Sequence, residues 1–217
     1  MGRFPNSVSM IHFGDATMTL FAAEPTELLP FDGSAVLHHW VLGDRRAGEV
    51  FDRLLDQTRW ESRTITMFGK QHLEPRMTAW HGDEGAVYVY SRIVLSPEPW
   101  TPLLASLRDI SADLAGTGFN SVLLNLYRDG NDKMGWHADD EPELGERPII
   151  ASMSLGAVRR FKFRHRHTRR VVECELPSGS LLVMSGDCQS NWVHEVPRQV
   201  RVREPRINLT FRRVGAR

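Results

Sequence analysis

The chain has 217 residues, 41% of them hydrophobic and 25% charged, which suits one compact globular domain. Its 27 basic and 27 acidic residues cancel, which argues against binding nucleic acid through net charge alone. The two cysteines form neither a metal-binding pair nor a disulfide framework, and no apolar run is long enough for a signal sequence or a membrane span. We therefore expect a soluble monomer with no membrane partner in a reducing compartment: cytoplasmic, nucleoid-associated in a bacterium, or nuclear in a eukaryote.

The N-terminal half contains helix and hairpin signals. Residues 30–33 (PFDG) predict a turn, and apolar residues at helical spacing predict helices over 47–59 and 103–114. Between the helices, TITMF (64–68) and AVYVYS (86–91) are typical of hairpin strands, the second following the turn-forming sequence GDEG.

The C-terminal half is a succession of strand candidates separated by turn signals such as DGN and PSG. This spacing favours a sandwich or a barrel, so we predict a mainly β (α+β), jelly-roll-like core with flanking helices. The predicted strands are SVLLNLY (121–127), IIASMSL (149–155), RRFKFRH (159–165), VVECEL (171–176), SLLVMS (180–185) and RINLTFRRV (206–214).

A candidate metal site begins with His137 and Asp139, which stand two residues apart. Alternate side chains of a strand share one face, so the imidazole and the carboxylate can reach the same ion. With His194 they would make the two-histidine, one-carboxylate triad of non-haem iron oxygenases, which leaves positions open for a cosubstrate and dioxygen. The pair alone is weak evidence, since a His and an Asp at this spacing more often make surface hydrogen bonds.

The last predicted strand indicates a polar pocket. Its odd positions, Ile207, Leu209 and Phe211, are apolar, and its even positions are polar. Two guanidinium groups on the polar face suit a dicarboxylate, because each can grip a carboxylate through two parallel hydrogen bonds. The alternative is an ordinary solvent-facing strand. The pocket residues predicted from this strand are Arg206, Asn208, Thr210 and Arg212, with Asn125 and Tyr127 added from another strand.

The order of NLY (125–127), HADDE (137–141), the distant His194 and RINLTFR (206–212) resembles the AlkB family of 2-oxoglutarate-dependent dealkylating dioxygenases. The resemblance covers residues 64–214 and implies a double-stranded β-helix fold. It implies that His137, Asp139 and His194 hold Fe(II), with dioxygen and 2-oxoglutarate as cosubstrates. Arg206 would grip the distal carboxylate of 2-oxoglutarate, and the other pocket residues would complete that site.

The segment 67–91 further resembles the nucleotide-recognition region of family members that act on double-stranded DNA. This implies an N-terminal extension and helix (1–62), a nucleotide-recognition hairpin lid (63–100) and a catalytic core (101–217) within one compact domain. An enzyme that acts on a base in a duplex must extrude it, so one side chain should fill the gap and another should stack on the base. We assign the gap to Phe68 beside Gly69 and Lys70, and the stacking to Tyr88 and Tyr90, with Arg76 in the same recognition set. Ordinary core or strand packing is the alternative for each aromatic residue.

Charged residues near the motifs suggest how damage and DNA are recognised. Asp140 and Glu141 would favour the positively charged lesions 1-methyladenine and 3-methylcytosine, and their alternative is a solvated turn. The basic segment RRFKFRHRHTRR (159–170) would grip the phosphate backbone, although a run of charges is often only a solvated face.

The predicted function is oxidative demethylation of alkylated DNA, with release of formaldehyde, succinate and CO2. The loop VPRQVRVREPR (196–206) has no contiguous triplet of cations, so the preference between single and double strands stays open, and RNA is a further possible partner. The alternatives are an oxygenase of the same fold acting on RNA or protein, and a nucleic-acid-binding module with a structural metal.

Overall fold

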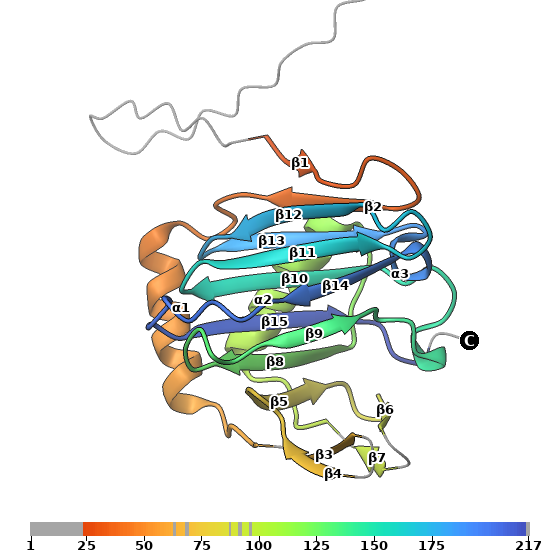
Figure 1. Cartoon of the computed structure of the whole chain (residues 1–217). Helices are drawn as coiled ribbons and strands as arrows, with labels where there is room; N and C mark the ends of the chain where they lie inside the picture. Colours follow the sequence, from red (N-terminus) through yellow and green to blue (C-terminus); the bar gives the residue numbers. More distant parts are fainter. Residues whose placement is uncertain are drawn as a thin grey trace, which may run out of the picture.

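Two antiparallel β-sheets packed face to face form the centre of the molecule (Figure 1). The structure is a computed structural model that describes residues 24–62, 64–67, 70–86, 88–90, 93–95 and 97–215. In Figure 1 the smaller sheet lies in front of the larger one. This double-stranded β-helix, a jelly-roll variant, is the fold class that the sequence predicted.

The larger sheet, called the major sheet, has the strand order β1-β2-β13-β10-β15-β8-β5. Its strands are β1 (Thr26–Glu27), β2 (Ser34–His38), β13 (Ser180–Ser185), β10 (Ile150–Gly156), β15 (Arg206–Arg212), β8 (Ser121–Tyr127) and β5 (Met77–Gly82). The smaller or minor sheet has the order β12-β11-β14-β9. Its strands are β12 (Val171–Leu176), β11 (Arg159–His165), β14 (Trp192–Val196) and β9 (Met134–His137).

Helices α1 (Asp44–Gln57) and α2 (Pro102–Ala115) cover the outer face of the major sheet, and α2 is seen behind the sheet in Figure 1. The Thr101 side chain caps α2 by accepting a hydrogen bond from the Leu104 amide (3.2 Å), and Gly116 ends the helix in the left-handed conformation (φ 66°). Both helices begin slightly before the predicted ranges, 47–59 and 103–114. Among the described residues, no helix has the length and apolar character needed to cross a membrane.

Two hydrophobic cores lie on opposite faces of the major sheet, and β15 contributes to both sides. Its apolar residues Ile207, Leu209 and Phe211 pack in the core under the helices. A second core, which includes Phe163 and Trp192, fills part of the space between the sheets. The polar side chains of β15 must therefore point between the two sheets, because successive side chains of a strand alternate. The predicted burial of the apolar face is confirmed.

Strong strand patterns were predicted with accurate boundaries and weak ones were missed. The structure confirms the predicted strands 121–127, 159–165, 171–176 and 180–185, and it shifts or shortens 149–155 and 206–214 by one or two residues. Strands β1, β2, β4 (Lys70–Leu73), β5, β7 (Ile93–Leu95) and β14 were not predicted, and the strand expected to carry both His137 and Asp139 ends at His137 in β9. The unpredicted strands are short or rich in polar residues, and three of them, β2, β5 and β14, pair with strands that are distant in the sequence.

The N-terminal part of the chain completes the major sheet. Within the range predicted as extension, β1 pairs with β2 and β2 pairs with β13; within the range predicted as lid, β5 pairs with β8. The rest of the predicted lid forms two small hairpin sheets, which lie below and to the right of β5 in Figure 1. These are β3 (Thr64–Met67) with β4 (Lys70–Leu73), and β6 (Tyr88–Tyr90) with β7 (Ile93–Leu95). The remaining short elements are a 3-10 turn (Pro142–Leu144) and α3 (Cys188–Asn191).

Candidate active site

A cavity of about 590 Å³ lies between the two sheets, within the size range of small-molecule sites. The major sheet lines it with the polar face of β15 and with β8 and β5, and the minor sheet lines it with β9 and β14. The cavity brings together residues predicted from separate motifs. Those on its wall are Arg76, Asn125, Tyr127, His137, Asp139, Glu141, His194, Arg206, Asn208, Thr210 and Arg212.

His137 and His194 face each other across paired strands. They are register partners in β9 and β14, and their ring centroids are 4.2 Å apart. The Nδ1 of His137 lies 2.8 Å from the Gly135 carbonyl oxygen, so this nitrogen donates and Nε2 is left as the metal-binding atom. The ring of His194 stacks on Phe161 at 5.3 Å, and its buried Nδ1 has no hydrogen-bond partner among the described residues.

Burial keeps the His194 imidazole neutral. Burial lowers the pKa of His194 to about 3; the neighbouring His137 adds to this effect, and the carboxylate of Asp139 opposes it. A neutral imidazole is the form that binds a metal ion. His194 therefore has the protonation state that a ligand needs at neutral pH.

Asp139 is a buried carboxylate with a cationic partner. Its Oδ1 accepts a short hydrogen bond from Arg212 Nη2, and its backbone amide donates to Gln189 Oε1 (2.9 Å). Burial raises the pKa of Asp139, but the effects that lower it, led by the charge of Arg212, outweigh burial, so the net pKa lies below the usual value. The carboxylate is ionised at neutral pH.

The predicted iron ligands are neighbours, but their side chains are not arranged as a complete ligand group. Within the described part of the chain, no three His, Cys, Asp or Glu side chains stand together as metal ligands, and Asp139 is turned to Arg212. The chemistry of the donor set nevertheless fits Fe(II): the neutral imidazole of His194, with an unpaired buried nitrogen, and the imidazole of His137 adjoin an ionised carboxylate. His137, Asp139 and His194 are therefore the residues that could hold the metal.

Arg206 has the geometry of a carboxylate-binding residue. Its side chain is only 1% exposed, and Nη2 donates to Ser154 Oγ (2.8 Å). Its Nε and Nη1 are buried and have no hydrogen-bond partner among the described residues. Burial lowers the pKa of Arg206 to about 10, so the group remains charged at neutral pH. A buried cation with unused N–H groups on a cavity wall suits a carboxylate ligand.

The rest of the polar wall is held by its own hydrogen bonds. Asn208 Nδ2 donates to Ser152 Oγ (2.8 Å) and to the Met153 carbonyl (3.1 Å), and Thr210 Oγ1 donates to Asn208 Oδ1 (3.0 Å). Sequence reasoning missed Ser152 and Ser154, although they alternate with apolar residues in the strand 150–156. It also missed Gln189, whose short helix has no local pattern.

Comparison with known proteins identifies the family. Residues 33–212 match the family model described as the 2OG-Fe(II) oxygenase superfamily. The alkB homolog 3 dioxygenase of Bos taurus is 42% identical over 181 residues, which is 78% of this chain and 62% of that protein. The DNA oxidative demethylase ALKBH2 of Homo sapiens is 40% identical over 185 residues, 80% of this chain and 71% of that protein. The chain belongs to the AlkB family of these oxygenases.

Further comparisons agree on the family and the fold. The ALKBH2 of Arabidopsis thaliana is 35% identical over 191 residues, 76% of this chain and 61% of that protein. A solved structure described as that of OsALKBH1 has a TM-score of 0.64 at 18% identity, with 87% of this chain and 100% of that chain covered, which shows a shared fold. The chain spans 62% of the length of the bovine alkB homolog 3. Fe(II), 2-oxoglutarate and dioxygen are the cofactor and cosubstrates of this superfamily.

The predicted substrate residues of this AlkB-family chain differ in how they are placed. Arg76 is buried on the cavity wall, where its Nε donates to Asn125 Oδ1 (2.8 Å). Glu141 lines the cavity, whereas Asp140 does not and forms an ion pair with Arg166 (2.7 Å). Phe68 and Gly69 lie outside the described residues. Lys70, Tyr88 and Tyr90 belong to β4 and β6, and their side chains lie outside the description.

The basic segment 159–170 is not a uniform phosphate-binding surface. Arg159 is 1% exposed and bonds to backbone oxygens, so its predicted contact with phosphate is wrong. Arg160 and Lys162 pair with Glu173 at 3.6 and 3.1 Å. The alternation of β11 explains this sorting, because its odd-numbered residues face the interior and its even-numbered residues face outward.

Proposed function

We propose that this protein is an Fe(II)- and 2-oxoglutarate-dependent dioxygenase that oxidatively demethylates alkylated bases in DNA. The observation that carries the proposal is one cavity that joins His137, Asp139 and His194 to the unused N–H groups of Arg206. The names of the relatives, DNA oxidative demethylase and alkB homolog 3 dioxygenase, support DNA as the substrate. We further propose 1-methyladenine- and 3-methylcytosine-type lesions as substrates, and action in the compartment that holds the DNA.

The reaction needs a metal and two cosubstrates, and the chain supplies their binding groups. When bound, Fe(II) with dioxygen and 2-oxoglutarate supplies the oxidation of the N-methyl group, which leaves as formaldehyde while 2-oxoglutarate becomes succinate and CO2. His137, Asp139 and His194 would hold the iron, and Arg206 would hold a carboxylate of 2-oxoglutarate. The enclosing sheets keep bulk water away from the reacting groups.

The acidic residues of the HADDE motif take different parts in this proposal. Asp140 is partly neutralised by Arg166, and Glu141 lies on the cavity wall. A base methylated on a pairing nitrogen carries positive charge, so a carboxylate on the wall would attract it more than a normal base. We therefore assign recognition of the charged lesion to Glu141 in preference to Asp140.

The direct test is product mass spectrometry. Protein loaded with Fe(II) under anaerobic conditions is mixed with 2-oxoglutarate, oxygen and oligonucleotides that carry 1-methyladenine or 3-methylcytosine, as single or double strands. The expected result is a restored base with an equal amount of succinate. Succinate without a restored base in any oligonucleotide would contradict the proposal, and repair of methylated RNA alone would change the substrate to RNA.

Matched variants locate the chemistry within the cavity. His137→Ala should abolish turnover while DNA affinity stays within about a few fold, because a metal ligand contributes to the oxidation more than to backbone binding. Glu141→Gln should slow repair of charged lesions more than Asp140→Asn does. Equal effects of the two substitutions would refute the assignment of lesion recognition to Glu141.

A further inference from the structure

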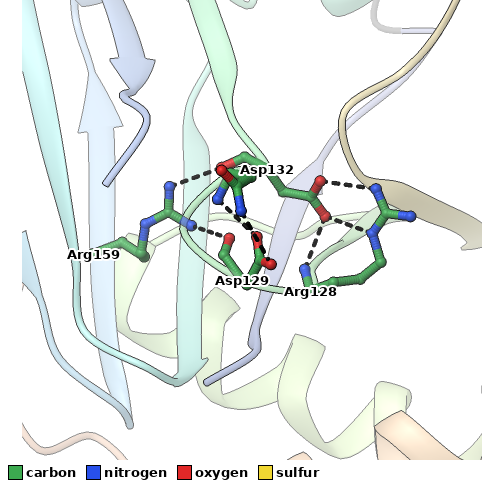
Figure 2. Close-up of polar contacts among 5 residues, drawn as sticks. Arg128, Asp129, Asp132 and Arg159 are labelled. Atoms are coloured by element: carbon green, nitrogen blue, oxygen red, sulfur yellow. Dashed lines mark hydrogen bonds and ion pairs between the residues drawn. The ribbon is translucent and has the colours of Figure 1, made fainter. Parts of the chain in front are cut away.

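Arg159 is a buried cation that contacts three backbone carbonyls. Its guanidinium donates to the carbonyl oxygens of Asp129 (3.0 Å), Asp132 (2.8 Å) and Pro197 (2.8 Å). Its Nε also donates to Gln199 Oε1 (3.2 Å). Figure 2 shows the bonds to Asp129 and Asp132. A buried arginine with this many acceptors is stabilised where a lone buried charge would be costly.

The carbonyls belong to two loops that adjoin the cavity-lining residues Tyr127 and Arg206. One loop joins β8 to β9, and the other joins β14 to β15. Gly130 links the loops directly, since its amide donates to the Val202 carbonyl (2.9 Å) and its carbonyl accepts from the Gln199 amide (2.8 Å). The two loops are so close that a Cβ on Gly130 would lie 1.8 Å from the backbone carbonyl oxygen of Gln199. Arg159 and Gly130 together hold the strand ends that carry Tyr127 and Arg206.

Arg159 also reaches the cavity wall indirectly, through an aromatic ring. Its Cζ lies 5.5 Å from the ring centroid of Tyr127, and the Cζ of Arg206 lies 5.2 Å from the same centroid. Tyr127 and Arg206 are register partners across β8 and β15, and both line the cavity. Arg159 is not among the cavity-lining residues in the described part of the chain. The ring therefore lies in contact with two cations, one that faces the ligand space and one that does not.

We propose that Arg159 is a positioning residue for 2-oxoglutarate. Arg159 holds Tyr127 and the two loops in place without touching the cosubstrate itself. Through Tyr127 and the loops, it orients the unused Nε and Nη1 of Arg206 toward the cosubstrate. The inference rests on the proposed function in one respect, namely that this cavity takes 2-oxoglutarate. It concerns affinity for the cosubstrate and requires no nucleic acid.

An arginine suits this position better than a lysine. A planar guanidinium offers several donors in fixed directions and can also lie over a ring, as Arg159 does with carbonyls from both loops and with Tyr127. A lysine ammonium keeps the charge but is a point donor without a flat face. Arg159→Lys should therefore fail to replace arginine even though the charge is conserved.

The experiment measures binding of 2-oxoglutarate by calorimetry to protein loaded with Mn(II), a redox-inactive substitute for Fe(II). Arg159→Met and Arg159→Lys should each raise the Kd of 2-oxoglutarate by about tenfold or more, because small displacements of a positioning group cost large factors. The affinity for Mn(II) alone should stay within about twofold of the wild type. In turnover assays the KM for 2-oxoglutarate should rise, while the KM for the methylated oligonucleotide should not change.

Arg128 provides the matched control in the same loop. It pairs with the Asp132 carboxylate through Nε and Nη2, both at 2.8 Å (Figure 2), but its side chain is half exposed and lies off the cavity wall. Arg128→Gln should leave the Kd of 2-oxoglutarate within about twofold, even if it lowers stability. An equal rise in this control would overturn the proposal in favour of general loosening of the loop.

A milder variant keeps the test decisive if Arg159→Met does not fold. Gln199→Leu removes one acceptor of Arg159, together with the acceptor of the Arg160 amide, and should raise the Kd of 2-oxoglutarate about threefold. An unchanged Kd in folded Arg159→Met or in Gln199→Leu would overturn the proposal. If the wild type binds 2-oxoglutarate but repairs no base, the proposed DNA substrate fails while this inference stands or falls on the Kd values alone.

Discussion

At the scale of the residue, Asp139 is a candidate metal ligand that forms a buried ion pair with Arg212. Its carboxylate is 2% exposed and depends on Arg212 for a counter-charge. A bound divalent cation would supply positive charge to the same carboxylate. The Asp139–Arg212 pair should therefore contribute more to the free energy of unfolding when no metal is bound than when a metal is bound.

We predict that Arg212→Met lowers the free energy of unfolding of the metal-free protein by about 3 kcal/mol, because it leaves a buried carboxylate without its partner. Saturating Mn(II) should recover part of this loss, since the cation replaces the missing charge. Chemical denaturation with and without Mn(II) measures both effects. The double variant Arg212→Met, Asp139→Asn should also recover stability, and a loss that is the same with and without Mn(II) would argue against the metal site.

At the scale of the element, β11 separates its basic residues into classes. Arg159 faces the interior, and Arg160 and Lys162 share Glu173 on the outer face. Arg164 lies over the ring of Trp136, 4.2 Å from its centroid, and forms no ion pair with any described carboxylate. Trp136 lines the cavity, so this cation lies against a residue of the cavity wall. Among the basic residues of β11, phosphate binding should therefore depend chiefly on Arg164.

We predict that Arg164→Gln weakens binding to DNA of any sequence and lowers the dependence of log K on log salt by about one. Arg160→Gln is the matched control and should change this slope much less, because Glu173 already neutralises Arg160. Fluorescence anisotropy over a range of salt concentrations measures the slopes. Equal changes in the two variants would contradict a special role of Arg164 in phosphate binding and would favour the alternative that the segment is only a solvated face.

The hairpin of β3 and β4 brings a prediction that still comes from the sequence alone, since Phe68 lies outside the described residues. Phe68→Ala should slow repair of a methylated duplex more than repair of the same strand alone, because only the duplex needs a side chain to fill the gap. Initial repair rates on paired oligonucleotides provide the comparison. Equal losses on both substrates would contradict the gap-filling role.

At the scale of the whole molecule, the site bridges the two sheets. The candidate metal ligands His137 and His194 come from the minor sheet, and Asp139 lies two residues beyond the end of β9. Arg206 comes from the major sheet. Ligands bound between the sheets should therefore stabilise the pair of sheets as a unit.

We predict that Mn(II) and 2-oxoglutarate together raise the thermal midpoint, since a ligand at 100 times its Kd contributes about 2.7 kcal/mol to stability. In Arg206→Met the increment from Mn(II) should remain and the increment from 2-oxoglutarate should be lost. Differential scanning calorimetry measures the two increments separately. Loss of both increments in a folded Arg206→Met would show that the metal and cosubstrate sites are not separable in this way.

Much of the site could be predicted because its signals are local. The alternation in 206–212 placed Arg206 and Asn208 on one face, and the spacing of His137 and Asp139 placed two donors near each other. Strands such as β5 and β14 were missed, because their short sequences have weak patterns and their partners are far away in the chain. Asp140 and Glu141 were predicted to have the same role, but in the structure Asp140 forms an ion pair with Arg166 and Glu141 lines the cavity.

The sequence by itself determined the family, the mainly β fold and the faces of its strongest strands, because motif order and a period of two are properties of neighbouring residues. Only the tertiary structure decided which arginines are structural and which have N–H groups left for a ligand. Arg159 is surrounded by carbonyls from residues 129, 132 and 197, whereas Arg206 keeps Nε and Nη1 unused. Burial and hydrogen bonding of a side chain depend on partners distant in sequence, so no local pattern distinguishes the two.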